Sequence, residues 1–209
     1  MSRKSAIERH IAELREDLLA ARKLSTENLA QQIQENGFSC QLCGECCQGM
    51  DNSVVVFPFE IRRIKAASGL EWLQAAEPPE EGEYDREGCF HTLEWRLKRI
   101  DGSCRFYQSG RCSIYEARPL LCSTYPFYLD RGRLQCSLCR GLGCKIDPEK
   151  AGEMAELLIL RYTTEIEEAI LLLEKYQDFE RGRPRKGGRC IVHDSEGMHC
   201  IHHKKSIYL

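Results

Sequence analysis

Four cysteines within eight residues constrain this chain more than any other feature. They are Cys40, Cys43, Cys46 and Cys47, and two residues separate each of the first three. This spacing lets one short loop present several sulfurs to a common centre. Thiolates are soft ligands for iron–sulfur clusters and for zinc. We therefore expect sulfur chemistry to organise the middle of the protein.

A second group of cysteines follows between residues 104 and 144. Its members are Cys104, Cys112, Cys122, Cys136, Cys139 and Cys144. Together with Cys89, eleven cysteines lie within residues 40–144, which is enough for two clusters of four thiolates each. We expect at least one cluster and favour two.

Composition favours metal ligands over disulfides. The chain has 13 cysteines in 209 residues, a length that can bury a core without covalent staples. After Met1 the chain runs into charged residues such as Arg3 and Lys4, and we expect no signal peptide. The apolar runs, such as residues 157–160, are far shorter than the roughly 20 residues of a membrane span. We expect a protein of the reducing cytoplasm with no membrane segment, where dense cysteines indicate metal binding.

Three interpretations of the four-cysteine loop stay open. An iron–sulfur cluster of the [4Fe-4S] type would take three thiolates from the loop and one from a distant cysteine, as in bacterial ferredoxins. A zinc ion could join one Cys-x2-Cys pair to a second, such as Cys136 and Cys139, but this leaves Cys46 and Cys47 without a role. Burial or disulfide pairing is the third, although the adjacent Cys46 and Cys47 could bridge only through a strained ring. The triple spacing favours iron–sulfur, with zinc as the alternative.

Periodicity predicts long helices on both sides of the cysteine-rich middle. Ser5 and Glu8 form a capping box, and the helix that follows carries an apolar stripe and continues to Gly37. Asp147 and Pro148 begin a second long helix. The two apolar faces consist of Ile7, Ile11, Leu14, Leu18 and Ala21 in the first, and of Ala155, Leu158, Tyr162, Ile166, Ala169, Leu173 and Tyr176 in the second.

Between these helices the sequence predicts short strands and turns. We expect a strand over residues 54–57, a helix from Pro58, a strand over residues 93–97, and hairpins at residues 101–102 and 130–132. Pro119 should begin a helix that carries Cys122 in its first turns, and residues 196–197 a last hairpin. The fold class is therefore α+β, divided into residues 1–37, 38–146, 147–180 and a linker with a Cys/His-containing tail, 181–209.

Charge gives little indication of a partner. Thirty basic residues nearly balance 32 acidic ones, so the chain has no bulk attraction to nucleic acid or membrane. The basic run over residues 181–189 lacks interleaved aromatic residues and is interpreted as a solvated linker. We expect an unidentified redox or protein partner, and a monomer or a homodimer that forms through the N-terminal helix.

Four ordered blocks resemble the YkgJ-like cysteine-cluster proteins, whose CxxCxxCC domain is described as chelating zinc or iron. The blocks are Cys40-x2-Cys43-Gly-Glu-Cys46-Cys47; Gly102-Ser-Cys104-Arg-Phe106-Tyr107; the stretch from Gly110 through Cys112, Tyr115, Arg118, Pro119 and Cys122 to Phe127; and Cys136-x2-Cys139-Arg-Gly141-Leu-Gly143. The resemblance covers about residues 38 to 146.

The resemblance implies a ligand set and little about the reaction. The set is Cys40, Cys43, Cys46, Cys47, Cys104, Cys112, Cys122 and Cys139. In this chain Cys136 and Cys144 add two sulfurs to the possible metal ligands, and Arg140 stands where the family commonly has proline. A flagellin lysine methylase is among the relatives, which keeps methyl transfer open.

Residues other than the clustered cysteines are also candidates for a role at the site. Arg118 could donate to cluster sulfides or hold an anion, or could pair with Glu116 at the surface. Four aromatic residues could shield a cluster from water or simply pack the core: Phe106, Tyr107, Tyr125 and Phe127. The tail holds Cys190, His193, His199, Cys200, His202 and His203, which are zinc-like ligand types at a spacing that fits no compact zinc module. Cys89 and His91 are a weaker case of the same kind.

Three function classes follow. The leading one is an iron–sulfur protein in electron transfer, redox or cluster assembly. An enzyme such as a protein methylase-like modifier is the second, and it would need a cluster iron with an open position. A structural zinc protein that binds a partner is the third.

Overall fold

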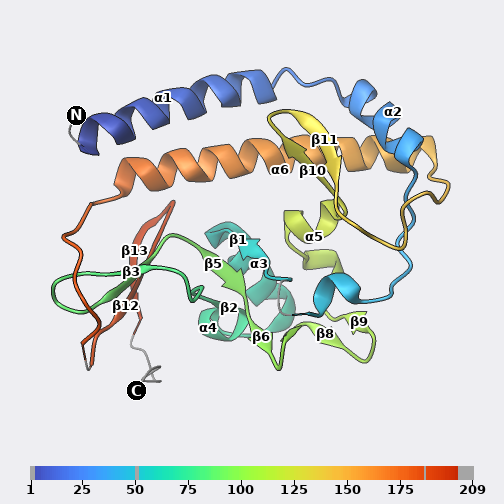
Figure 1. Ribbon diagram of the computed structural model, residues 1–209. Helices are drawn as coiled ribbons and strands as arrows, with labels where there is room; N and C mark the ends of the chain where they lie inside the picture. Colours follow the sequence, from blue (N-terminus) through green and yellow to red (C-terminus); the bar gives the residue numbers. More distant parts are fainter. Residues whose placement is uncertain (1–2, 50–51, 186, 202–209) are drawn as a thin grey trace.

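A layer of helices lies over a layer of short strands and small helices (Figure 1). The computed structural model describes residues 3–49, 52–185 and 187–201. The helices are α1 Arg3–Ala21, α2 Thr26–Asn36, α3 Pro58–Ser68, α4 Trp72–Ala75, α5 Leu120–Thr124 and α6 Pro148–Lys175, with short 3₁₀ helices at Glu45–Cys47 and Tyr115–Ala117. The α+β fold class predicted from the sequence is confirmed.

Within the described residues, the strands are short and form five small sheets. They are β1 Val55–Val56, β2 Ala76–Glu77, β3 Glu83–Tyr84, β4 Phe90–Thr92, β5 Trp95–Leu97, β6 Arg99–Ile100, β7 Ser103–Cys104, β8 Tyr107–Gln108, β9 Arg111–Cys112, β10 Phe127–Asp130, β11 Arg133–Cys136, β12 Cys190–Asp194 and β13 Gly197–Ile201. The largest sheet has the order β13-β12-β4-β3, and a three-stranded sheet has the order β1-β5-β2.

In the helical layer, α1 and α2 both pack along helix α6 (Figure 1). The predicted N-terminal stripe is buried here: Ile11, Leu14, Leu18 and Ala21 pack against Tyr162, Ile166 and Ile170 of α6. Helix α2 buries Leu29 and Ile33 against the first half of α6. The N-terminal stripe therefore packs on the chain's own long helix.

The prediction of one continuous N-terminal helix to Gly37 was wrong. The chain leaves the helix after Ala21, and Ser25 begins a new one by accepting a hydrogen bond from the Asn28 backbone N–H (3.1 Å). Gly37 does end the second helix, at φ +66°. The first helix already includes Arg3, two residues before the predicted capping box.

The tail hairpin β12–β13 is part of the lower layer. Strand β12 pairs in parallel with β4, with Cys190 opposite Phe90 and Val192 opposite Thr92. Cys190 and Val192 are fully buried in a core with Trp95 and Phe106. Residues far apart in the sequence thus share one hydrophobic core.

The three hairpins that the turn residues predicted are present. Asp101 and Gly102 both have positive φ and join β6 to β7, and Arg131 and Gly132 do the same between β10 and β11. Residues 195–196 connect β12 to β13. The strand predicted over residues 93–97 begins only at Trp95, and Leu93 is exposed.

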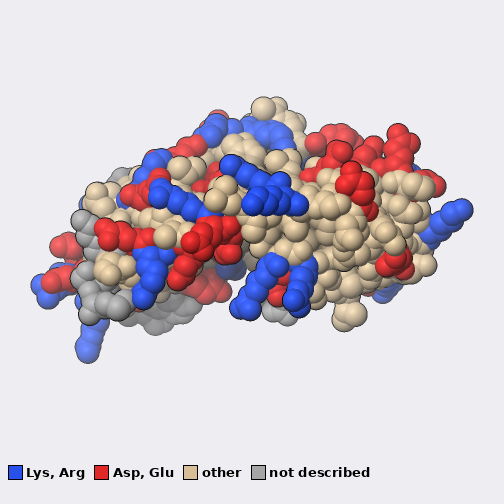
Figure 2. Space-filling view, turned by 90° about the horizontal axis from the view of Figure 1, so that it is seen from above, with Lys and Arg blue, Asp and Glu red and all other residues tan. Residues whose placement is uncertain are grey.

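Positive and negative side chains are interspersed over the helical layer. Figure 2 looks down on this face, where acidic side chains gather toward the end that holds α2 and the start of α6. Among the described residues, no helix combines the length and the apolar character needed to cross a bilayer.

Replacing Leu158 with Ala should destabilise the fold strongly. Leu158 is 1 % exposed and packs with Leu29, Ile33 and Phe127, so truncation leaves a cavity that typically costs about 2–5 kcal/mol. Leu160 on the same helix is 51 % exposed, and its change to Ala should stay within about 0.5 kcal/mol. Urea unfolding measures both variants, and equal losses would contradict this packing.

Candidate metal centre

The four-cysteine loop is fixed on one side by the last cysteine block. The Ser39 N–H donates to Gly141 O (3.0 Å), and the Gly143 N–H donates to Gly37 O (3.1 Å). A side chain on Gly141 would have its Cβ 2.3 Å from Ser39 O, so the two backbones approach as closely as glycine permits. The first and last blocks of the cysteine pattern are therefore neighbours in space.

On its other side the loop meets the second block. Gln48 forms a β-bridge with Ser103, next to Cys104 in β7. Gly44 has φ +73°, and a Cβ there would lie 2.1 Å from the Tyr107 hydroxyl oxygen. Position 44 thus requires glycine for two reasons: its backbone is left-handed, and the Tyr107 ring leaves no room for a side chain.

A buried carboxylate positions the helix that carries Cys122. Glu60 is 1 % exposed; its Oε1 accepts from the Leu120 N–H (2.7 Å) and its Oε2 from the Phe57 N–H (3.1 Å). Burial raises the pKa of Glu60, and these two donors partly oppose that shift. At the other end of α5, Arg161 of α6 donates to Thr124 Oγ1 (3.0 Å).

Four thiols form one group, which we call the inner thiols. Cys104, Cys112 and Cys122 pack on the core that contains Phe106, and Cys47 is the fourth. Burial raises the pKa of Cys122 most, and the thiolate charges of Cys104, Cys46 and Cys112 raise it further. A hydrogen bond with Cys46, then burial, then the charges of Cys46, Cys104 and Cys122 raise the pKa of Cys47.

Three further thiols form an outer group: Cys40, Cys43 and Cys139. Burial raises the pKa of Cys139, and the charges of Cys43, Cys40 and Cys46 add to the shift in that order. Cys40 is exposed, while Cys43 and Cys139 are half-buried. Of these three thiols, Cys40 is thus the nearest to solvent.

Cys46 is the link between the two groups. Its sulfur lies 4.0 Å from the sulfur of Cys47, and the hydrogen bond between them lowers the pKa of Cys46 to about 7. Its charge also acts on Cys112 and Cys122 among the inner thiols and on Cys139 among the outer ones. The adjacent pair Cys46 and Cys47 therefore stands where the groups meet.

This donor set suits a soft cation. Ionising several neighbouring thiols is unfavourable because each thiolate raises the pKa of the next, and a bound metal removes that penalty. Among the described residues, no three His, Cys, Asp or Glu side chains already stand close enough to hold one metal ion. The thiols therefore suit a metal through their chemistry and because they lie near one another.

Two predicted ligands stand apart from these groups. Cys136 is exposed at the end of β11, opposite Phe127. Cys144 lies near the Gln41 amide, with 3.8 Å between its sulfur and Gln41 Nε2. In the described part of the chain, the interactions that link the other eight thiols include neither residue. Arg140, at the family's proline position, forms an ion pair with Glu45 (2.5 Å).

Arg118 faces the thiols. Its guanidinium lies 3.7 Å from the centroid of the Tyr115 ring, and its Nε donates to Ser123 Oγ (3.3 Å). Its charge lowers the pKa of both Cys46 and Cys112. These contacts favour a role for Arg118 as a positive charge beside the thiols over a surface ion pair with Glu116.

The four aromatic residues have different surroundings. Phe106 is buried in the core beneath the inner thiols, and Tyr107 covers Gly44. Phe127 is buried in the second core, edge-on to Phe38 at 5.8 Å between centroids. The Tyr125 hydroxyl donates to Leu138 O (2.6 Å) beside the last block. Phe106 and Tyr107 thus adjoin the inner thiols and the cysteine loop, and Tyr125 lies near the outer thiols, because burial and then the charges of Cys139, Cys46 and Cys43 raise its pKa.

The Cys/His tail residues are distributed over separate environments. Cys190 is buried in the core, and Cys200 is exposed. His193 hydrogen-bonds His91 (2.8 Å), and His199 contacts Asp194 (2.9 Å). Cys89 is buried near Asp85, whose Oδ1 accepts its backbone N–H. His202 and His203 lie outside the described residues.

Sequence reasoning missed several residues that shape this region. Glu60, Gln48 and the Gly44–Tyr107 contact join segments that are distant along the chain, so no local pattern signals them. The buried pair His91 and His193 depends on the parallel pairing of β4 with β12. The pairing Gln48–Ser103 likewise follows from the fold and not from composition.

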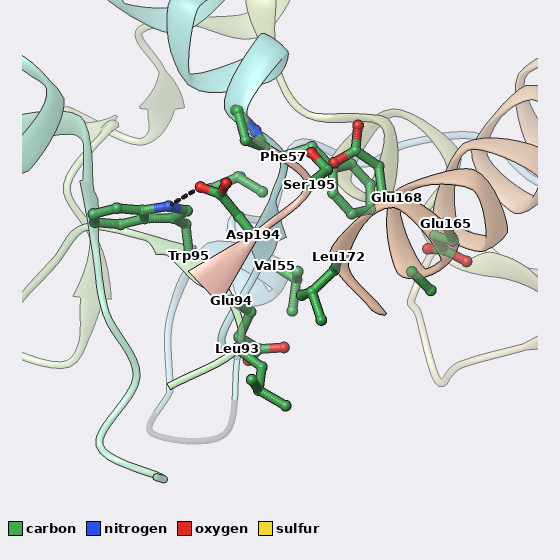
Figure 3. Close-up of a pocket in the computed structure, with 13 residues that line it drawn as sticks. Val55, Phe57, Leu93, Glu94, Trp95, Glu165, Glu168, Leu172, Asp194 and Ser195 are labelled. Atoms are coloured by element: carbon green, nitrogen blue, oxygen red, sulfur yellow. Dashed lines mark hydrogen bonds between the residues drawn. The ribbon is translucent and has the colours of Figure 1, made fainter. Parts of the chain in front are cut away.

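A cavity of about 170 Å³ lies elsewhere, between α6 and the sheet (Figure 3). Trp95 donates to Asp194 (2.8 Å) at its edge, and Glu165 and Glu168 approach it from α6. Burial raises the pKa of Glu168. Its lining contains no cysteine among the described residues, so it is separate from the thiols.

Comparison with protein families agrees with the sequence blocks. Residues 39–140 match the CxxCxxCC family model, whose description is "putative zinc- or iron-chelating domain". No solved structure matches the chain. The matched segment contains both the inner and the outer thiols.

Changing Gly44 to Ala should disturb metal binding, whereas Gly143 to Ala should not. Both glycines have positive φ, which costs a non-glycine residue about 1 kcal/mol, but only at Gly44 does the new methyl overlap Tyr107. Metal content and urea unfolding distinguish the two variants. Adding Tyr107→Ala to Gly44→Ala should recover part of the lost stability. Equal metal loss in both single variants would refute the role of the Tyr107 contact.

Proposed function

Because residues 39–140 belong to the CxxCxxCC family of zinc- or iron-chelating domains, we propose that this chain is an iron–sulfur protein with two [4Fe-4S] clusters. The observation that carries the proposal is the division of eight thiols into two groups that meet at Cys46 and Cys47. One cluster is assigned to Cys40, Cys43, Cys46 and Cys139. The other is assigned to Cys47, Cys104, Cys112 and Cys122.

The electrostatic neighbours of each thiol support this division. Cys139 is affected by Cys43, Cys40 and Cys46, whereas Cys122 is affected by Cys104, Cys46 and Cys112. The fourth ligand for the loop is therefore Cys139, and Cys122 belongs to the second group. Adjacent cysteines that serve different clusters resemble two-cluster ferredoxins, in which the last cysteine of a run ligates the other cluster.

The surroundings suit electron transfer. When bound, such clusters supply one-electron redox chemistry, and their potential depends on charge, hydrogen bonds and exposure. The ligands assigned to the first cluster include the exposed Cys40 and Cys46, which supports a cluster that a partner can reach. Of the inner thiols, Cys104, Cys112 and Cys122 pack on the hydrophobic core, and the Arg118 charge offsets thiolate charge between the groups. We propose an electron-transfer or cluster-assembly role with a redox partner.

Zinc is the second candidate, because the family description includes it and eight thiolates could also hold zinc ions. Three features favour iron–sulfur: the triple two-residue spacing, a use for both Cys46 and Cys47, and a charged group beside the sulfurs. The metal analysis below separates the two.

Protein purified without oxygen should be brown and contain iron with acid-labile sulfide. Two clusters predict about eight irons per chain. The measurement combines iron, sulfide and zinc analysis with electron paramagnetic resonance after reduction. Colourless protein with stoichiometric zinc, and without sulfide even after reconstitution, would establish the zinc alternative in place of this proposal.

Single cysteine variants test the assignment of ligands. Cys139→Ser and Cys122→Ser should each reduce iron by roughly half, since each removes a ligand of a different cluster. Cys200→Ser is the control, because Cys200 is exposed on β13 and should keep the full iron content. The double variant Cys139→Ser/Cys122→Ser should lose nearly all iron. If either single variant already does so, the thiols form one centre and not two.

A further inference from the structure

Three polar residues form a buried hydrogen-bonded chain in the largest sheet. Asp85 Oδ2 lies 3.0 Å from His91 Nε2, and His91 Nδ1 lies 2.8 Å from His193 Nε2. Asp85 and His91 are each 8 % exposed and His193 is 2 % exposed. His193 Nδ1 is buried and has no hydrogen-bond partner among the residues that the structure describes. The chain lies outside the thiol groups, and the proposed function does not use it.

A short segment after α6 covers this pair, and we call residues 176–182 the strap. The Phe179 ring stacks on His91 at 3.9 Å between centroids, and the Tyr176 ring lies 5.1 Å from His193. The far end of the strap is fastened by the Gly182 N–H, which donates to Tyr84 O (2.7 Å), and by a bridge between Asp85 and Arg181. The aromatic rings of the strap therefore lie directly against both imidazoles.

The geometry of the pair sets how many protons it can hold. A gap of 2.8 Å between two nitrogens accommodates one hydrogen, which one ring donates and the other accepts. If both rings were imidazolium ions, two N–H groups would point at each other across that gap. With the strap closed, the pair therefore carries at most one positive charge, which Asp85 balances.

Other charged groups around the pair do not alter this limit. Glu83 lies opposite His91 in the β3–β4 register and pairs with Arg181 (2.7 Å), and Asp178 also pairs with Arg181. Asp194 follows His193 and accepts from Trp95 and His199. Lys175 donates to Ser195 O, Glu180 of the strap pairs with Arg86, and the Tyr176 ring lies against His193.

Burial and the His91 charge lower the pKa of His193, and Asp194 opposes this shift only partly. Asp85 responds in the opposite sense. Burial would raise its pKa, but donors from His91 and the Cys89 backbone outweigh burial and lower it. Asp85 thus stays ionised and accepts a hydrogen bond from His91 Nε2, while His193 stays neutral in the closed state.

We propose that His91 and His193 form an acid-sensitive latch that releases the strap from the sheet when the second imidazole is protonated. The sign follows from proton linkage. The closed state binds fewer protons than the open one below the ordinary histidine pKa of about 6.5, so acid favours opening. The open pair can take two protons and the closed pair only one, so at one pH unit below that value the second proton raises the ratio of open to closed strap by up to about tenfold relative to the neutral pair.

Hydrogen exchange of the strap tests the latch. In the wild type, exchange of residues 176–182, corrected for the intrinsic rate, should accelerate about tenfold between pH 8 and pH 5.5. In His193→Gln it should change less than twofold, because the amide can donate to or accept from His91 but carries no charge. His10→Gln, at an exposed histidine on α1, is the matched control and should behave as the wild type.

Two outcomes would overturn the proposal. One is strap exchange that is independent of pH in the wild type, and the other is an unchanged acid response in His193→Gln. If His193→Gln fails to fold at pH 8, ring-nitrogen NMR of the wild type decides. The latch requires the closed pair to gain a single proton as pH falls, and uptake of two protons with the strap still closed contradicts it.

Discussion

The crowding of thiols around one short loop is the constraint on which the site depends. Eight cysteines lie where burial and neighbouring thiolates raise the pKa of most of them, so the chain must hold them together against an electrostatic cost. Backbone contacts do this: Ser39 with Gly141 on one side, and Gln48 with Ser103 on the other. Glycines at positions 44 and 141 allow the approach. The scaffold thus gathers the thiols through main-chain contacts between the cysteine-containing segments.

Much of the local structure could be predicted from the sequence, because its causes are local. Asp101–Gly102 and Arg131–Gly132 occupy positive-φ turns, and Pro148 begins the long helix after Asp147. The predictions of local structure were wrong where another interaction outweighed the local sequence pattern. The apolar pattern ran on past Ala21, but Ser25 captured a backbone N–H and began a separate helix. Leu93 fitted an alternating pattern, yet the strand formed only where β1 and β2 could pair with β5.

For the candidate site, too, some features could be predicted from the sequence and others could not. Spacing and blocks of sequence indicated which cysteines belong together, but the order of residues could not show how they are shared. Whether Cys122 or Cys139 accompanies the loop depends on α5, which Glu60 and Arg161 position from helices α3 and α6. The buried His91 and His193 pair could not be foreseen either, because residues 91 and 193 meet only through the parallel register of β4 and β12.

That register also connects the metal centre to the tail. Cys104, Cys112 and Cys122 pack against the same core that buries Cys190 and Val192 of β12. Metal binding and folding are coupled wherever ligands are part of a core, since the binding free energy stabilises the packed arrangement. A metal that fixes the inner thiols therefore stabilises the surface on which β12 lies, and with it the partner strand of His91. The family segment ends at residue 140, but the core that supports its ligands is completed only by residues 190–201.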